Sequence, residues 1–130
     1  DNTVKSIIMK NDEKVISALE DMKRQIEVEQ WTIFANDRGS GSAGVRQVDN
    51  SDVIDDYLKF AKTGENSELP QCESISYTAV EDFDDEDKEL VEEILENYGE
   101  YVERDEVLGL VVINEHYDMD YTFCMLHIKE

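Results

Sequence analysis

The apolar run Val107–Ile113 is the feature that most constrains the fold of this 130-residue chain. Its length matches a β-strand rather than a helix, and its continuous apolar character is typical of a strand inside a sheet. We therefore expect this run to be a central strand. The rest of the chain must supply its neighbours in the sheet and the helices that cover it.

Three other segments space their apolar side chains three and four residues apart, which indicates amphipathic helices. The first covers about 12–25, and Gly64 and Gly99 stand where the second and third should end. The side chains expected to cap the helices are Asp12, Asn50 or Ser51, and Asp84 or Asp85. The apolar stripes are Val15, Ile16, Leu19, Met22 and Ile26; Val53, Ile54, Tyr57, Leu58 and Ala61; and Leu90, Val91, Ile94, Leu95 and Tyr98.

Four more segments have the composition or the alternation of β-strands. The first two predict a hairpin, whose connection Asp37–Gly44 is rich in glycine and serine and longer than a two-residue turn. A turn is expected at 114–118, and 2–9 is either a short strand or the lead-in to the first helix. The four segments are 27–35, 45–48, 74–80 and 117–128.

These patterns give the order (β)-α-β-β-α-β-α-β-β in a single domain over 1–130. Because neighbouring strands read as hairpins, we expect an α+β fold. Its sheet is mixed or mainly antiparallel with about five strands, and about three helices pack on one face. The expected core residues are Leu19, Met22, Trp31, Ile33, Ile54, Leu58, Ile75, Tyr77, Leu90, Ile94, Leu95, Leu110, Val112, Phe123 and Met125.

Acidic residues outnumber Lys and Arg by 33 to 12, and the net charge of −21 is unevenly distributed. Residues 1–62 carry a net charge of −3, whereas residues 63–130 carry −18. Such a surface repels nucleic acids and anionic membranes, so neither is an expected partner. Self-repulsion on this scale also destabilises a fold. The acidity therefore indicates either a solvated face or a basic binding partner.

The acidic side chains of the third predicted helix lie off its apolar stripe. A column of like charges at three- and four-residue spacing is expected from Glu89, Glu92, Glu96 and Glu100. A nucleic-acid backbone also presents closely spaced anions. In size and charge the chain resembles proteins that mimic DNA, which phages and mobile elements use against host defence systems. The residues expected to contact a basic partner are Glu86, Asp87, Glu89, Glu92, Glu93, Glu96, Glu100, Glu103, Asp105 and Glu106.

The glycine-rich segment Gly39–Gly44 is the one motif that argues for an enzyme, because it matches the pattern G-x-G-x-x-G. Residues Arg38–Ala43 also resemble the R-x-x-G-x-A pyrophosphate loop of the GNAT acetyltransferase family, which implies an acyl or phosphate donor. In such loops a helix opens directly after the glycines, whereas the β-like Val45–Val48 follows here. A hairpin loop is therefore the expected structure.

No metal or cofactor site is expected from the remaining polar residues. On an EF-hand pattern that starts at Asp82, Asp87 occupies the position that requires glycine, so helix capping is expected instead. Neither His116 nor His127 lies at a metal-ligand spacing. Cys72 and Cys124 fit a reducing compartment, although the sequence leaves a disulfide between them open.

Together these features favour a non-enzymatic protein of a bacterial or host cytoplasm. It would occupy a basic, nucleic-acid-binding protein surface, as an anti-defence inhibitor does. One alternative is an immunity or antitoxin protein that neutralises a basic nuclease. Others are a small enzyme that uses the glycine loop, and a solvated domain of a larger assembly or of a salt-adapted protein. The oligomeric state stays open, a dimer included.

Overall fold

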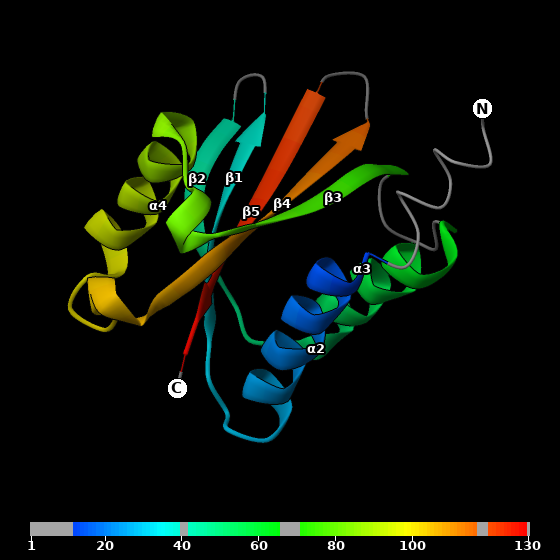
Figure 1. The fold of residues 1–130 in the computed structure, drawn as a ribbon, viewed down its shortest axis with the longest axis horizontal. Coiled ribbons are helices and arrows are strands. Elements are labelled where there is room, and N and C mark those ends of the chain that lie inside the picture. Colours follow the sequence, from blue (N-terminus) through cyan, green and yellow to red (C-terminus); the bar gives the residue numbers. More distant parts are fainter. Residues whose placement is uncertain (1–11, 40–41, 66–70, 117–119, 130) are drawn as a thin grey trace.

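The computed structural model describes residues 12–39, 42–65, 71–116 and 120–129. Within them, helices and strands alternate in the predicted order and form an α+β fold (Figure 1). The helices are α2 (Glu13–Glu27), α3 (Ser51–Thr63) and α4 (Asp85–Tyr98). The strands are β1 (Ile33–Gly39), β2 (Ser42–Val48), β3 (Gln71–Ala79), β4 (Val107–His116) and β5 (Asp120–Ile128). Two short 3₁₀ helices are η1 (Val80–Asp82) and η2 (Arg104–Glu106). The segment at 2–9 lies outside the described residues.

The helix ends confirm the capping signals that the sequence carries. The Asp12 side chain accepts hydrogen bonds from the first turn of α2, and Asn50 accepts one from the first turn of α3. Gly64 ends α3 in the left-handed conformation with φ of 77°, which glycine adopts without strain. At the start of α4, Asp84 and Asp87 bond reciprocally to each other's backbone N–H groups and form a capping box.

The sheet is antiparallel throughout, with strand order β2-β1-β5-β4-β3. Strand β5 is in the middle and β4 lies beside it, so the apolar run Val107–Ile113 is an interior strand. Strand β1 pairs with β5, which joins the early part of the chain to its end. Each of the neighbouring pairs β1–β2 and β4–β5 is a hairpin, as predicted.

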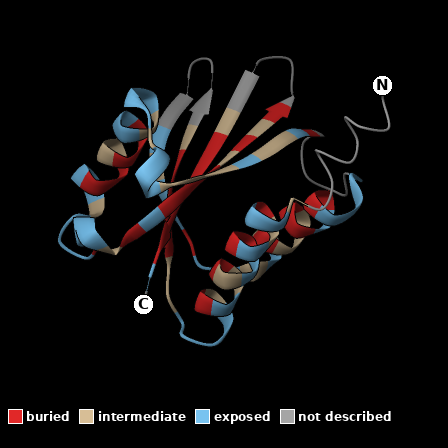
Figure 2. Ribbon diagram, viewed as in Figure 1, coloured by how far each residue is buried: buried red, intermediate tan, exposed pale blue. Residues whose placement is uncertain are grey.

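Helices cover both faces of the sheet, so the expectation of helices on one face was wrong (Figures 1 and 2). On one face, α2 and α3 pack over a core that includes Val111 and Phe123. On the other face, α4 packs over a second core that includes Leu110 and Cys124. Adjacent residues of β4 and β5 thus point into different cores. Both strands are therefore apolar at successive positions and not only at alternate ones.

Most of the predicted core residues are buried. Trp31, Ile75, Tyr77 and Val112 are instead only partly buried and pack at the margins of the two cores. The sheet also separates the cysteines, because Cys72 belongs to the α2–α3 core and Cys124 to the α4 core. No disulfide joins them.

Several boundaries differ from the sequence prediction. The first strand was predicted from residue 27, whereas α2 continues to Glu27 and β1 begins only at Ile33. Pairing in the β1–β2 hairpin continues to Gly39 and Ser42, so only residues 40–41 separate the two strands. The prediction of a longer loop was therefore wrong. Strand β3 begins three residues earlier than expected, at Gln71. Strand β4 continues through the predicted turn to His116, because β3 and β5 both supply backbone partners there. In the part of the chain that the structure describes, no helix has the length and apolar character needed to cross a membrane.

Candidate protein-binding surface

The predicted acidic residues of α4 and the segment after it lie mainly on the outside of the molecule. Helix α4 turns its buried stripe toward the sheet, and its opposite side is exposed (Figure 2). Asp87, Glu92, Glu93 and Glu106 are only partly exposed. We define the α4 surface as the exposed carboxylates Glu86, Glu89, Glu96, Glu100, Glu103 and Asp105.

Several of the predicted contact residues are engaged within the protein itself. Asp87 belongs to the capping box at the start of α4. Glu93 accepts a hydrogen bond of 3.3 Å from the buried Asn36 of β1. Glu106 accepts one of 3.2 Å from the backbone N–H of Glu103. These carboxylates hold α4 and η2 in place, so they contribute less to an outward-facing site than the sequence pattern suggests.

Glu92 of α4 forms an ion pair with Arg104 of η2. The Arg104 guanidinium donates two hydrogen bonds to the Glu92 carboxylate, one from each terminal nitrogen. The hydrogen bond and the charge of Arg104 lower the pKa of Glu92. This pair joins the middle of α4 to η2 and fixes the segment between them. The Arg104 guanidinium is thus paired with a residue outside the α4 surface.

The predicted column of like charges is shorter than expected. Helix α4 ends at Tyr98, and Glu100 lies in the turn that follows. The column therefore stops at Glu96. Beyond it the chain turns back, and a hollow of about 550 Å³ opens between the turn and η2. Its lining is Leu95, Gly99, Val102, Glu103, Arg104 and Asp105.

The glycine-rich segment does not have the geometry of a phosphate cradle. Gly39 and Gly44 both belong to paired strands of the β1–β2 hairpin. The next helix, α3, begins only at Ser51. A cradle of this type needs a helix N-terminus directly after the glycines. The resemblance at Arg38–Ala43 therefore covers one β-hairpin.

Among the described residues, no group of His, Cys, Asp or Glu side chains could hold a metal ion. Asp82 ends the 3₁₀ helix η1, and Asp85–Tyr98 is α4, so the segment that starts at Asp82 caps and forms a helix, as predicted, and not an EF-hand loop.

A hydrogen-bonded chain of Asp21, His127 and Tyr77 was missed by the sequence analysis. His127 Nε2 lies 2.8 Å from Asp21 Oδ2, and His127 Nδ1 lies 2.8 Å from the Tyr77 hydroxyl. Burial and the carboxylates of Glu81 and Asp21 raise the pKa of Tyr77, so its phenol stays protonated. Both imidazole nitrogens are occupied. We therefore interpret these hydrogen bonds as an anchor that holds α2 on the sheet rather than as an acid–base pair.

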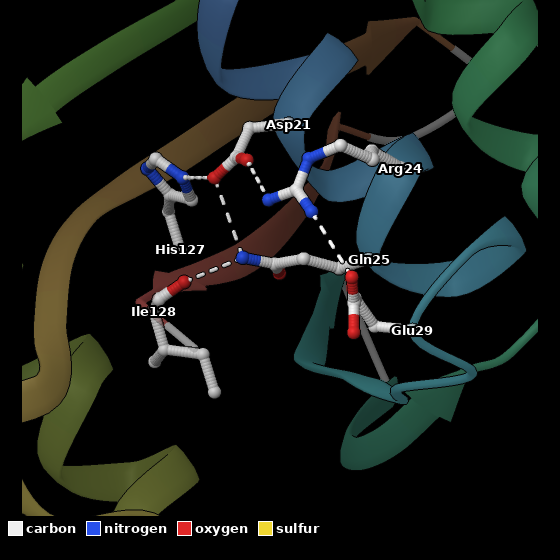
Figure 3. A network of polar contacts seen from close by, with 6 residues as sticks. All are labelled: Asp21, Arg24, Gln25, Glu29, His127 and Ile128. Carbon is white, nitrogen blue, oxygen red and sulfur yellow. Dashed lines mark hydrogen bonds and ion pairs between the residues drawn. The ribbon is translucent and has the colours of Figure 1, made fainter.

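The same anchor extends along α2 (Figure 3). Arg24 also binds Asp21, at 2.7 Å, and Gln25 donates a 2.8 Å hydrogen bond to the backbone oxygen of Ile128. Burial acts to raise the pKa of Asp21, but the hydrogen bonds of His127 and Arg24 outweigh it and lower the pKa. The contacts of Gln25 with Ile128 and of Asp21 with His127 connect residues about a hundred positions apart, so no local sequence pattern predicts them.

A buried carboxyl group lies at the other end of the α2–α3 core. Glu115 is 5% exposed and accepts a 2.7 Å hydrogen bond from the Tyr57 hydroxyl. Burial raises the pKa of Glu115, and the charge of Asp37 raises it further. Burial and the charge of Glu115 also raise the pKa of Cys72, to about 12, so this thiol is not an activated nucleophile.

We expect Glu115→Gln to stabilise the protein at neutral pH by about 1 kcal/mol. The amide oxygen can still accept the hydrogen bond from Tyr57, and no charge is buried. A raised carboxyl pKa favours folding below the ordinary value of 4.5, and this contribution is lost as the pH rises through the folded value. Urea melts of the variant and of the native protein at several pH values measure the difference. Glu20→Gln, at an exposed position of α2, is the control.

The gain should vanish at a pH low enough to protonate Glu115. A variant less stable than the native protein at neutral pH would contradict this interpretation, because the ionised carboxylate would then make a net favourable contribution.

Comparison of the chain with models of protein families, with curated proteins and with solved structures finds no match.

Proposed function

We propose that this chain is a non-enzymatic acidic binding protein whose α4 surface occupies a basic, nucleic-acid-binding surface of another protein. The observation that supports this most directly is the arrangement of exposed carboxylates on α4 and the segment after it. Residues 80–106 contain only two basic side chains, and Arg104 is bound to Glu92. The repulsion among the six carboxylates is thus left for a partner to relieve.

The fixed shape of this region favours recognition by charge. Helix α4 is capped at its start, packed on the sheet through four buried residues and tied to η2 by the Glu92–Arg104 pair. Its carboxylates are therefore already in position, so little ordering opposes association. A surface whose charges are all negative also attracts a basic partner over a distance and accelerates association at low salt.

Such a protein would act in the cytoplasm, where nucleic-acid-binding proteins of a bacterial or host cell are accessible. A DNA mimic would block several proteins that share a nucleic-acid-binding groove. An immunity protein, the alternative, would neutralise one nuclease.

The test begins with capture of partners from a bacterial lysate at about 0.1 M and about 0.5 M salt, because salt weakens exposed ion pairs. Each captured protein is purified, and its binding to DNA is measured with and without the chain. We expect the chain to displace DNA. Reversing Glu86, Glu89 and Glu96 to Lys should weaken binding of the chain roughly tenfold or more. Glu92 and Glu93 are left unchanged because they make internal contacts.

The matched control carries the same change of net charge on α2 and α3, at the exposed Glu13, Glu20 and Asp52. Equal loss of binding in both variants would mean that only net charge matters and would contradict a site on α4. Partners that keep their DNA in the presence of the chain would contradict the mimic. Inhibition of a single nuclease would favour the immunity alternative.

A further inference from the structure

An aromatic hollow lies between the end of α4, the start of β1 and the end of β5. It has a volume of about 370 Å³. Trp31, Phe34 and Tyr101 contribute three aromatic rings to its wall, and Tyr101 is 67% exposed. An exposed tyrosine beside a tryptophan is typical of protein-binding surfaces. The other lining residues are Thr32, Gln47 and Ile128.

The inner wall of this hollow is held firmly by the fold. The ring of Phe34 stacks on Tyr98 of α4, with centroids 4.7 Å apart and an angle of 27° between the planes. The backbone N–H of Trp31 donates a 2.8 Å hydrogen bond to the oxygen of Gln25. Ile128 is 3% exposed and closes the base. The hollow is therefore present before any partner arrives, with Tyr101 as its exposed side.

One carboxylate, that of Glu100, contacts the exposed aromatic side of the hollow through Tyr101. A hydrogen bond to the neighbouring Glu100 raises the pKa of the Tyr101 phenol. The segment that carries Tyr101 continues with Glu103, Asp105 and Glu106. The backbone oxygen of Glu106 accepts a 2.9 Å hydrogen bond from the N–H of Lys129, which places it beside the end of β5. An apolar aromatic wall and the Glu100 carboxylate thus meet at Tyr101.

We propose that this hollow receives an arginine side chain of the basic partner. A guanidinium group stacks flat on aromatic faces and is more weakly hydrated than an ammonium group. Its N–H groups can donate at the same time to the Glu100 carboxylate beside Tyr101. The proposal rests on the proposed function and adds to it the side chain that anchors the partner.

Trp31 allows a direct measurement, because it is the only tryptophan of the chain and lines the hollow. The probes are the blocked peptide Gly-Arg-Gly-Arg-Gly and its lysine counterpart, which carries the same charge. We expect the arginine peptide to change the Trp31 fluorescence with saturation. We expect the lysine peptide to bind about fivefold more weakly.

Two variants of Tyr101 separate stacking from charge. Tyr101→Ala removes the exposed aromatic side without changing the net charge and should weaken arginine binding about fivefold. Tyr101→Phe keeps the ring and should bind like the native protein. Circular dichroism confirms that both variants fold; Tyr101 is exposed, so neither change opens the core.

Equal affinity for the two peptides, or native affinity in Tyr101→Ala, would overturn the arginine site. If the captured partner still loses its DNA to Tyr101→Ala and depends on Glu86, Glu89 and Glu96, the proposed function survives that failure. Arginine-peptide binding can depend on Tyr101 while the reversal of these three glutamates leaves partner binding unchanged. That result would support the arginine site and contradict the α4 surface as the binding site.

Discussion

Replacing Ile94 or Leu110 with alanine should destabilise the protein by about 2–5 kcal/mol. Both side chains are 0% exposed. Ile94 comes from α4 and Leu110 from β4, and both belong to the core on the α4 side of the sheet. Each truncation removes buried apolar surface and leaves a cavity that neighbouring strands cannot fill without breaking their pairing.

Urea denaturation followed by far-ultraviolet circular dichroism gives the free energies of unfolding. Glu96→Ala is the matched control, because it lies on the exposed side of the same helix and should change stability by less than about 0.5 kcal/mol. A loss below about 1 kcal/mol at both Ile94 and Leu110 would contradict the packing of α4 on the sheet.

The position of α4 shows why part of the fold escaped the sequence analysis. Phe123, Cys124, Met125 and Leu126 are all buried, although alternation in this segment indicated one buried face. Cys124 and Leu126, at the positions between these residues, are also apolar, which is compatible with a sheet covered on both faces. The continuous apolar run in β4 carried the same information, because a strand exposed on one side does not need apolar residues at successive positions.

Helix ends were predictable because their causes are local. The residue that caps a helix lies within three positions of the backbone groups it bonds, as Asp84 and Asp87 illustrate. The hairpin tip was misjudged for the opposite reason. Glycine and serine indicate a loop by composition, yet backbone pairing across Gly39 and Ser42 needs no particular side chain.

The candidate site was predictable in outline only. Helical spacing separated the buried stripe of α4 from its acidic side correctly. It could not show that Glu93 turns to Asn36 or that Arg104 bonds to Glu92, because these contacts depend on elements brought together by the sheet. Trp31 was predicted as a core residue, whereas it is only partly buried at the margin of the core on the α4 side. Its place beside Tyr101 follows from the chain turning back after α4.

His127→Leu should destabilise the protein by about 2 kcal/mol at neutral pH. The change leaves the Tyr77 hydroxyl and one oxygen of Asp21 without the imidazole that joins them. Arg24 continues to bind Asp21, which keeps the loss moderate. Tyr77→Phe removes only the bond to Nδ1, so we expect a smaller loss of about 1 kcal/mol.

The dependence on pH distinguishes the two variants. Asp21 has a lowered pKa in the folded protein, so its contribution to stability is present above the ordinary value of 3.8 and is lost as the pH falls through the folded value. His127→Leu removes most of that contribution, and its stability should approach that of the native protein as the pH falls below 3.8. Tyr77→Phe leaves the hydrogen bond between His127 and Asp21 in place. Its loss of stability relative to the native protein should therefore stay constant over this range.

Denaturant melts of the three proteins at matched ionic strength measure these differences.

The position of Tyr77 also explains why residue 109 is glycine, because a side chain there would collide with the Tyr77 hydroxyl and the backbone oxygen of Thr78. If His127→Leu keeps the same deficit at acid and neutral pH, Asp21 does not depend on the imidazole. The chain from Asp21 through His127 to Tyr77 would then contribute by packing alone.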